Sequence, residues 1–220
     1  MSFVMIAIDG PAGAGKGTLA HHLARLYNLS HLDTGLLYRG VALKMIEKEQ
    51  FLVNEEAAIR AALSLKTEDL KNSSLRDEVV GNLASEIAAL PQVREILLKF
   101  QRDFAKNVTP GKQGVVLDGR DIGLVVLPES LCKIYVTASP EVRAQRRLKE
   151  LQQKGISSIY EDVFKDIQTR DVRDEKRKIS PLRPAKDAYI LDTSELGIDD
   201  VIKKACLFVD LKYPEIDKIA

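Results

Sequence analysis

A glycine-rich stretch near the N-terminus carries the clearest chemical signal in the sequence. It reads Asp9-Gly10-Pro11-Ala12-Gly13-Ala14-Gly15-Lys16-Gly17-Thr18, with an apolar segment before it and an amphipathic segment after it. Glycines let the backbone curl so that successive N–H groups point inward, and the N-terminus of a following helix adds a partial positive charge. The pattern predicts a phosphate-binding loop, in which Lys16 reaches the terminal phosphates of ATP or GTP. We expect the ligand contacts to come from Gly10, Pro11, Ala12, Gly13, Ala14, Gly15, Lys16, Gly17 and Thr18.

Two further segments place charged side chains directly after apolar ones. They are Leu32-Asp33-Thr34-Gly35-Leu36-Leu37-Tyr38-Arg39 and Val115-Val116-Leu117-Asp118-Gly119-Arg120-Asp121-Ile122-Gly123. Ligands of open α/β sheets bind at the carboxyl ends of the strands, so these charges indicate a second anion site, which a phosphotransferase requires. Asp33 or Thr34 also suits the N-cap of a helix. A guanine-specific switch is excluded, because the sequence has no Asn-Lys-x-Asp element to read the base.

The elements that must position these residues alternate between strands and helices. Strands are predicted over 3–9, 31–33, 114–118, 133–138 and 189–192. Helices are predicted over 16–27, through Tyr38 to Met45, from Pro91 onward, and as a pair between 140 and 177, while 50–90 forms a polar, helix-prone excursion. Strands that alternate with helices pair in parallel and are covered by helices on both faces. The fold class is therefore α/β.

Arginine is concentrated in the C-terminal half of the chain. Residues 139–186 hold 13 Lys and Arg against 8 Asp and Glu, a net charge of +5. The guanidinium group is permanently charged and offers a planar fork of donors, which suits phosphate. One predicted helix has an apolar face that continues into a charged one. The apolar residues are Tyr160, Val163, Phe164 and Ile167, and the charged residues that follow on the same face are Arg170, Asp171 and Asp174. This end of the helix is predicted to point into a polar cleft.

In these motifs the chain resembles the bacterial cytidylate kinases of the nucleoside monophosphate kinase family. The resemblance rests on segments 9–18, 32–39 and 118–123, on Arg-Asp-x-Arg-Asp at 170–174 with Arg177, and on Ser-Pro-Leu at 180–182. Gly17 after the loop lysine, where most phosphate loops have Ser or Thr, is usual in that family. The resemblance implies a P-loop kinase fold, with a five-stranded parallel sheet, a small region that binds the nucleoside monophosphate and a helical lid. It implies a single domain over 1–220, with the acceptor-binding excursion at about 35–105 and the lid at about 140–178.

The same resemblance implies that the γ-phosphoryl group of ATP is transferred to CMP or dCMP. The acceptor phosphate would be held by Arg39, Arg120 and Arg170, and the sugar by Thr34, Tyr38 and Asp174. Cytosine would be read by Ser85, Arg94, Asp121 and Arg177, and Gly119 would contribute to the same acceptor site. An arginine with an aspartate suits the edge of cytosine, which carries both acceptors and an amino donor.

Catalysis is implied to need charge stabilisation rather than a general base, because the acceptor phosphate is already an oxyanion. The implied catalytic residues are Lys16, Arg120, Arg170 and Arg146. Arg143, Arg146 and Arg147 belong to the lid segment that closes over ATP in this family. Mg²⁺ is expected with ATP, bound mostly by phosphate oxygens and water, with Thr18 as its best protein ligand.

Two alternatives to this function remain open from the sequence. Many bacterial members carry a small β-rich insertion in the acceptor region, whereas the stretch between Tyr38 and Ser85 is short here and helical in pattern. A kinase of another acceptor such as UMP is therefore the first alternative. The second is a non-catalytic module that binds ATP to dock a partner. Such a module has no need for the second anion site formed by Arg39, Arg120 and Arg170.

The composition of the whole chain limits its partners. Among 220 residues, 33 Lys and Arg balance 32 Asp and Glu, which argues against a dedicated nucleic-acid or membrane-surface protein. We see neither a signal peptide nor an apolar run of membrane-spanning length, and we expect a cytoplasmic monomer. Cys132 and Cys206 are expected to be buried free thiols. His21, His22 and His31 lack metal-ligand spacing and are expected at the surface or at helix caps.

Overall fold

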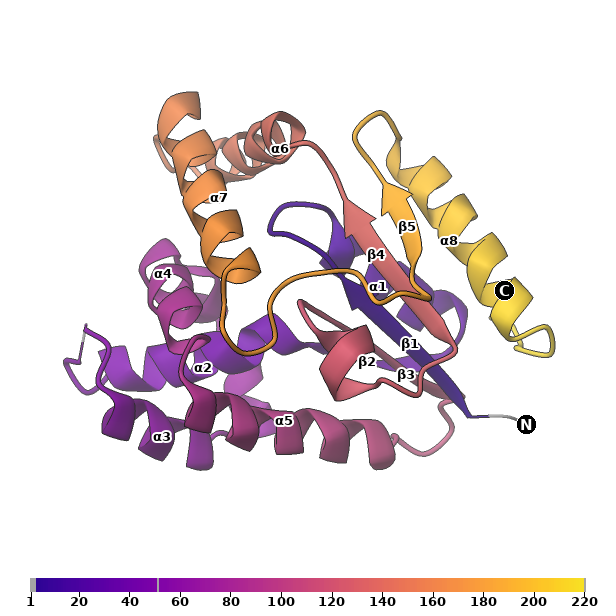
Figure 1. The fold of residues 1–220 in the computed structure, drawn as a ribbon, viewed down its shortest axis with the longest axis horizontal. Helices are drawn as coiled ribbons and strands as arrows, with labels where there is room; N and C mark the ends of the chain where they lie inside the picture. The colour runs from indigo at the N-terminus through magenta and orange to yellow at the C-terminus, as the bar shows by residue number, and fades with distance from the viewer. Residues whose placement is uncertain (1–2, 51, 220) are drawn as a thin grey trace. The chain divides into compact units, whose positions relative to one another are not determined.

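The computed structural model of the chain describes residues 3–50 and 52–219. Its centre is a five-stranded parallel sheet with the strand order β2-β3-β1-β4-β5 (Figure 1). The strands are β1 (Val4–Asp9), β2 (Leu29–Asp33), β3 (Gly114–Gly119), β4 (Cys132–Thr137) and β5 (Tyr189–Asp192). The predicted sheet is confirmed, and each predicted strand differs from the observed one by at most two residues at either end.

The central strand β1 fixes where the functional loops begin. It pairs in parallel with β3 on one side, with Asp9 opposite Gly119, and with β4 on the other, with Asp9 opposite Tyr135. Every residue of β3 is buried, and Ile6 and Ile8 of β1 are fully buried. Such continuous burial is typical of parallel strands covered on both faces. The carboxyl ends of β1 and β3 therefore lie side by side.

Two helices cover one face of this sheet. The helices α1 (Lys16–Leu26) and α8 (Ile198–Lys212) bury their apolar faces against β1 and β4 (Figure 1). Tyr27 follows α1 and is fully buried, and its hydroxyl group donates a hydrogen bond of 2.7 Å to the carboxylate of Asp210 on α8. The sequence pattern predicts α1 but no element after the strand at 189–192, and α8 is a helix that the pattern does not indicate.

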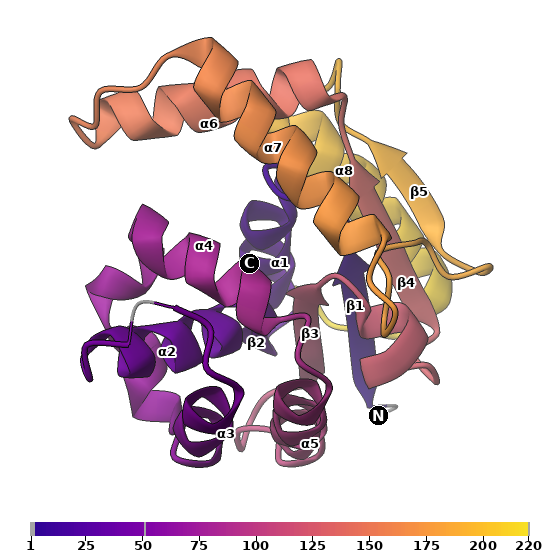
Figure 2. The same ribbon diagram turned by 60° about the vertical axis from the view of Figure 1, so that its left-hand side comes forward.

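The predicted helical pair after β4 is confirmed. It consists of α6 (Pro140–Gln153) and α7 (Tyr160–Glu175), which lie side by side and are joined at their outer end (Figure 2). Ala144 and Leu151 of α6 pack against Val163 and Ile167 of α7. Ser139 caps the N-terminus of α6, because its hydroxyl group accepts a hydrogen bond from the backbone N–H of Val142. Pro140 is the first residue of the helix, a position that suits proline.

The chain divides into two compact units. The first comprises Met1–Leu32 and Val108–Ala220 and contains the sheet, and the second comprises Asp33–Asn107. Apart from Asp33, which ends β2, the described part of the second unit consists of helices and the loops between them, as its sequence pattern predicted. Its elements are α2 (Thr34–Ile46), α3 (Glu55–Leu63), α4 (Glu78–Ile87), α5 (Pro91–Lys106) and two short 3₁₀ turns, Thr67–Lys71 and Ser73–Arg76.

No helix in the described residues is long and apolar enough to cross a membrane. Cys132 is buried and Cys206 is half-buried, and both are free thiols, so the expectation of full burial holds only for the first. Burial raises the pKa of the Cys132 thiol to about 12, which keeps it protonated and unreactive.

Candidate functional site

The glycine-rich loop connects the carboxyl end of β1 to the N-terminus of α1. Gly10 has a φ of 147°, and a Cβ atom built on it would lie 1.9 Å from the carbonyl oxygen of Val136 on β4. Only a residue without a side chain lets the backbone pass this close to the neighbouring strand. Gly15 adopts φ 93° as the N-cap of α1, where no acidic side chain occupies the first turn. The loop therefore presents an uncompensated helix N-terminus, a site that favours phosphate.

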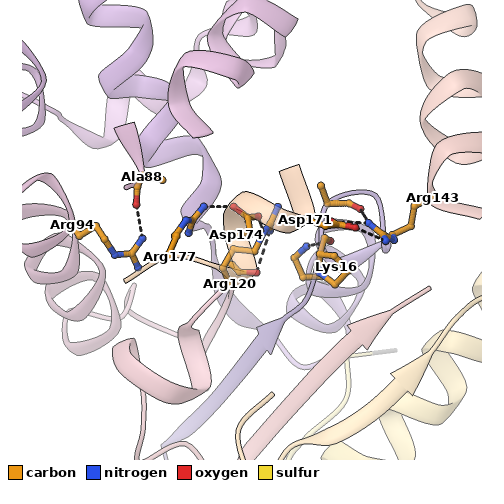
Figure 3. Close-up of polar contacts among 11 residues, drawn as sticks. Lys16, Ala88, Arg94, Arg120, Arg143, Asp171, Asp174 and Arg177 are labelled. Carbon is orange, nitrogen blue, oxygen red and sulfur yellow. Dashed lines mark hydrogen bonds and ion pairs between the residues drawn. The ribbon is translucent and has the colours of Figure 1, made fainter. Parts of the chain in front are cut away.

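Lys16 lies at the start of α1 within this loop. Its side chain is buried, and Nζ donates a hydrogen bond of 2.7 Å to the carbonyl oxygen of Pro11 (Figure 3). The bond holds the ammonium group over the curled backbone, between the end of β1 and the first turn of the helix. A cation in this position can stabilise the charge of terminal phosphates.

A second cationic cluster lies in the same unit, around the carboxylate of Asp174. Asp174 projects from α7 with 1% of its surface exposed, and its Oδ2 accepts a hydrogen bond of 2.8 Å from Nε of Arg120. Its other oxygen accepts from the guanidinium group of Arg177 (Figure 3). Burial alone raises the pKa of Asp174, but the charges of Arg120, Arg177 and Arg170 hold it below its usual value. The carboxylate thus stays ionised and gathers arginines beside the loop that follows β3.

The lid arginines make different contacts from one another. Arg143 is buried and forms a two-pronged ion pair with Asp171 of α7, with bonds of 3.0 and 2.7 Å, and it also donates to the carbonyl oxygen of Ala12 (Figure 3). Arg146 donates to the hydroxyl and carbonyl oxygens of Thr193, at 2.9 and 2.7 Å. Arg143 therefore ties α6 and α7 to the phosphate loop, a structural role that the sequence did not indicate.

In the second unit, five of the predicted acceptor residues lie on the helices α2, α4 and α5, namely Thr34, Tyr38, Arg39, Ser85 and Arg94. Arg39 of α2 donates to the carbonyl oxygens of Leu75 and Asp77, and its guanidinium group lies 2.6 Å from where a Cβ on Gly81 would stand. Arg94 of α5 donates to the carbonyl oxygen of Ala88 (Figure 3) and lies 5.7 Å from the centroid of the Tyr38 ring.

Ser85 of α4 is buried, and its hydroxyl group has no hydrogen-bond partner among the described residues. A buried hydroxyl without a partner is costly, which suits a group that binds a ligand. Asp33 caps α2, because its carboxylate accepts a hydrogen bond from the backbone N–H of Gly35, and Thr34 is the buried first residue of that helix.

Two carboxylates at the ends of β1 and β3 were not singled out by the sequence analysis. Asp9 accepts hydrogen bonds from the backbone N–H groups of Ile122 and Gly123, and Asp118 lies 2.8 Å from Nε2 of His31. His31 is thus a partner of a buried carboxylate rather than a surface or capping residue. The position of Asp9 immediately before the glycine loop is the one feature of the sequence that could have indicated a functional role for this residue.

The residues around the loop fit a Mg²⁺ ion that is bound mainly by ATP. Thr18 is exposed in the first turn of α1, and a carboxylate oxygen of Asp118 lies 3.9 Å from where a Cβ on Gly17 would stand. Among the described residues, no group of three or more His, Cys, Asp and Glu could hold a metal ion by itself. Mg²⁺ commonly keeps several waters and binds through one or two protein oxygens plus phosphates, which matches this donor set.

A phosphate loop at the centre of a parallel sheet, with a second arginine cluster beside it, defines a P-loop phosphotransferase. The sequence model of the cytidylate kinase family matches residues 6–210. Cytidylate kinase of Paramagnetospirillum magneticum is 50% identical over 91% of this chain and 95% of its own. The enzyme of Methylocella silvestris is 48% identical over 97% of both chains. The chain belongs to the cytidylate kinase family.

Solved structures agree with the fold. An uncharacterised protein from Eubacterium ventriosum aligns with a TM-score of 0.51 at 13% identity, over 96% of this chain and 99% of its own. At that level of identity the likeness concerns the arrangement of strands and helices alone.

Substituting Gly10 by alanine is expected to destabilise the protein by about 3 kcal/mol or more, because the new methyl group overlaps the Val136 carbonyl group and the backbone must move. Urea unfolding monitored by circular dichroism measures this loss. Gly111→Ala is the matched control, since Gly111 also has a positive φ of 85° but has open space where the Cβ would stand. The control should lose only about 1–2 kcal/mol. Equal losses in both variants would contradict the close approach.

Substituting Asp174 by asparagine is expected to cost about 3 kcal/mol at neutral pH, because two guanidinium groups lose a buried carboxylate. The pKa of Asp174 is lowered in the folded state, so its contribution is complete above the ordinary aspartate pKa of about 3.9 and is lost as the pH falls through the folded pKa. The difference in unfolding free energy between the two proteins should therefore shrink below about pH 4. Asp166→Asn, on the exposed face of the same helix, should change stability by less than about 0.5 kcal/mol. A difference that persists unchanged in acid would contradict the role of the ionised carboxylate.

Proposed function

We propose that this chain transfers the γ-phosphoryl group of ATP to CMP or dCMP and releases ADP with CDP or dCDP. Membership of the cytidylate kinase family supports the substrates. One structural observation carries the proposal, namely that a buried carboxylate, Asp174, gathers Arg120 and Arg177 in the same unit as the phosphate loop. A module that only bound ATP would gain nothing from this cluster.

The register of the sheet supports two anion sites next to each other. Asp9, which precedes the phosphate loop, pairs with Gly119, which precedes Arg120. Neighbouring parallel strands lie about 4.8 Å apart. In this proposal, a donor phosphate bound by the loop and an acceptor phosphate bound by Arg120 lie close together. Transfer of a phosphoryl group requires this closeness.

In the proposed enzyme, residues Gly10 to Thr18 bind the phosphates of ATP, and Lys16 contacts the group in transfer. Arg39, Arg120 and Arg170 bind the acceptor phosphate, which carries about two negative charges at neutral pH. Thr34, Tyr38 and Asp174 bind the sugar. The orphaned Ser85 hydroxyl supports the remaining assignment, in which Ser85, Arg94, Asp121 and Arg177 bind the base and Gly119 borders the acceptor.

The chemistry then needs no general base. An oxygen of the acceptor phosphate attacks the γ-phosphorus, the bond from that phosphorus to the bridging oxygen breaks, and the electron pair leaves with ADP. Lys16, Arg120 and Arg170 stabilise the charge that spreads over the transferred group. Mg²⁺, bound by the phosphates with Thr18 nearby, would neutralise further charge. Arg146 approaches the transferred phosphate when α6 and α7 close, and this closure excludes water as a competing acceptor.

We also infer that the enzyme works as a monomer in the cytoplasm, with ATP and CMP or dCMP as its only partners. The balanced net charge of +1 supports the absence of a nucleic-acid partner. Gel filtration with light scattering tests the monomer directly.

Release of ADP in a coupled assay tests the function, with CMP, dCMP, UMP, AMP and GMP offered singly with Mg-ATP. We expect rapid turnover on CMP and dCMP, because an arginine with an aspartate matches the edge of cytosine. Comparable rates on UMP would mean that the all-helical acceptor region has changed the specificity. No turnover on any acceptor, with ATP still bound in calorimetry, would contradict the proposal and favour a binding module.

Arg120→Ala is expected to lower turnover on CMP by about 100-fold or more, because the acceptor phosphate loses a cation at the site of transfer. The dissociation constant of ATP should change by less than about threefold, since the loop contacts remain intact. Arg183→Ala, which removes an exposed arginine, is the control and should leave both values unchanged. Near-normal turnover in Arg120→Ala would contradict the second anion site.

A further inference from the structure

Asp9 makes a contact that the proposed mechanism does not use. It is the last residue of β1 and is 5% exposed. Its Oδ1 accepts a hydrogen bond of 2.7 Å from the backbone N–H of Ile122, and its Oδ2 accepts one of 2.8 Å from that of Gly123. Hydrogen bonds to a charged acceptor are stronger than those between neutral groups. One buried carboxylate therefore holds two consecutive amides of a distant segment.

This contact fixes the chain on the C-terminal side of two proposed acceptor residues, Arg120 and Asp121, whose N-terminal side is fixed by the sheet. Upstream, Gly119 is fixed by its parallel pairing with β1. Downstream, Ile122 and Gly123 are fixed by the Asp9 carboxylate, and they begin the π-helical turn η3 (Ile122–Val126). Arg120 and Asp121 are the only two residues between these anchors. Their backbone has little freedom, so the direction of both side chains depends on Asp9.

We propose that Asp9 is a positioning residue for acceptor binding, which holds Arg120 and Asp121 in place by fixing the segment that follows them. The inference rests on the proposed function, because that function makes Arg120 and Asp121 acceptor residues. Asp9 itself contacts neither nucleotide in this mechanism. The alternative is that Asp9 only supports the glycine loop that follows it, in which case its loss would affect ATP as much as CMP.

The two roles predict different effects of Asp9→Asn on the KM for CMP and on the KM for ATP. The amide keeps the shape of the side chain but offers a single oxygen, and its NH₂ group faces an N–H donor. We expect the KM for CMP to rise about tenfold or more, in line with the loss of a charge-assisted hydrogen bond. The KM for ATP should change by less than about threefold. Equal increases in both values, or no change in either, would overturn the proposal.

A matched control separates this effect from lost stability. Asp210 of α8 also accepts a hydrogen bond through its carboxylate, from the hydroxyl group of Tyr27, and it pairs with Lys218. Tyr27 follows the C-terminal end of α1 and Lys218 lies after α8, so both contacts are made away from the two loops. Asp210→Asn should lower the unfolding temperature without changing either KM. A shift in the KM for CMP in this control would mean that the acceptor site responds to stability in general, which would contradict the proposal.

The pH dependence gives a readout that a purely structural role would not produce. Burial raises the pKa of Asp9 to about 6, against the lowering effect of the two backbone N–H groups. Asp121 raises it and Lys16 lowers it, and Lys133 and Tyr135 of β4 are the other charged or titratable groups nearby. Above about pH 6 the carboxylate accepts both bonds, whereas below it one oxygen carries a proton.

The ratio of the KM for CMP in Asp9→Asn to that in the wild type should therefore be largest near pH 8 and fall towards one near pH 5. The ratio cancels the titration of CMP itself, whose phosphate also has a pKa of about 6. A ratio that does not vary with pH would overturn the role of the ionised carboxylate.

A measurement without substrate keeps this inference separate from the proposed function. In the wild-type protein, the amide proton shifts of Ile122 and Gly123 in NMR spectra should titrate together with a midpoint of about pH 6. In Asp9→Asn this step should be absent and both amides should exchange faster with solvent. If the chain fails to phosphorylate CMP but these signals behave as expected, the function is wrong and the contact stands. If CMP is phosphorylated and the amides do not titrate, the positioning role is overturned.

Discussion

The structure depends on holding several guanidinium groups close to an electropositive loop without the repulsion that such crowding brings. Two carboxylates on one helix resolve this conflict. Asp174 lies between Arg120 and Arg177, and Asp171, one turn earlier, forms a two-pronged pair with Arg143. A buried ion pair adds little net stability, because desolvation offsets the attraction. Its value here is positional, since the arginines are held in place before a phosphate arrives.

The helix α7 joins these two pairs to different parts of the first unit. Through Asp171 and Arg143 it is connected to the carbonyl oxygen of Ala12 in the phosphate loop, and through Asp174 it is connected to Arg120 after β3. The apolar face of the same helix, with Val163 and Ile167, packs on α6. A movement of this helix pair would therefore displace the glycine-rich loop and Arg120 together. This connection is a physical basis for the proposed lid, whose closure would complete both proposed phosphate sites.

The sequence was sufficient for the features that local rules determine. The glycine loop, the five strands and the helical pair follow from periodicity, from turn residues and from the position of one lysine. The charged end of the stripe from Tyr160 indicated a polar environment for Asp174, and the structure shows this carboxylate paired with arginines, although buried rather than in an open cleft. The helical nature of the second unit was also predicted, although α8 was missed, because no strand or motif after Asp192 drew attention to it.

The contacts that were not predicted join residues far apart in the chain. Asp9 and Ile122 are separated by 113 positions, and His31 and Asp118 by 87. The residues of each pair meet only because the strand order places β3 between β1 and β2. Arg143 is a comparable case, since the sequence shows an arginine among others on a charged helix, and only packing reveals that it is buried against Asp171. A pattern can predict which residues reach one edge of the sheet, but which of them pair there depends on strand order.

The end of β1 shows why strand order matters for function as well as for stability. A parallel sheet brings the loops that follow β1 and β3, the proposed donor and acceptor loops, together at one edge. The pairing of the strands alone does not prevent the two loops from moving independently. The carboxylate of Asp9 removes that freedom, because it belongs to the strand that precedes the donor loop and binds the segment that follows the acceptor arginine. An apolar residue in its place would leave two backbone N–H groups unsatisfied in a buried setting. Burial raises the pKa of this carboxyl group to about 6, and its two hydrogen bonds connect the end of β1 to the segment that follows β3, which fixes the spacing of the two backbone segments on which the proposed phosphate sites lie.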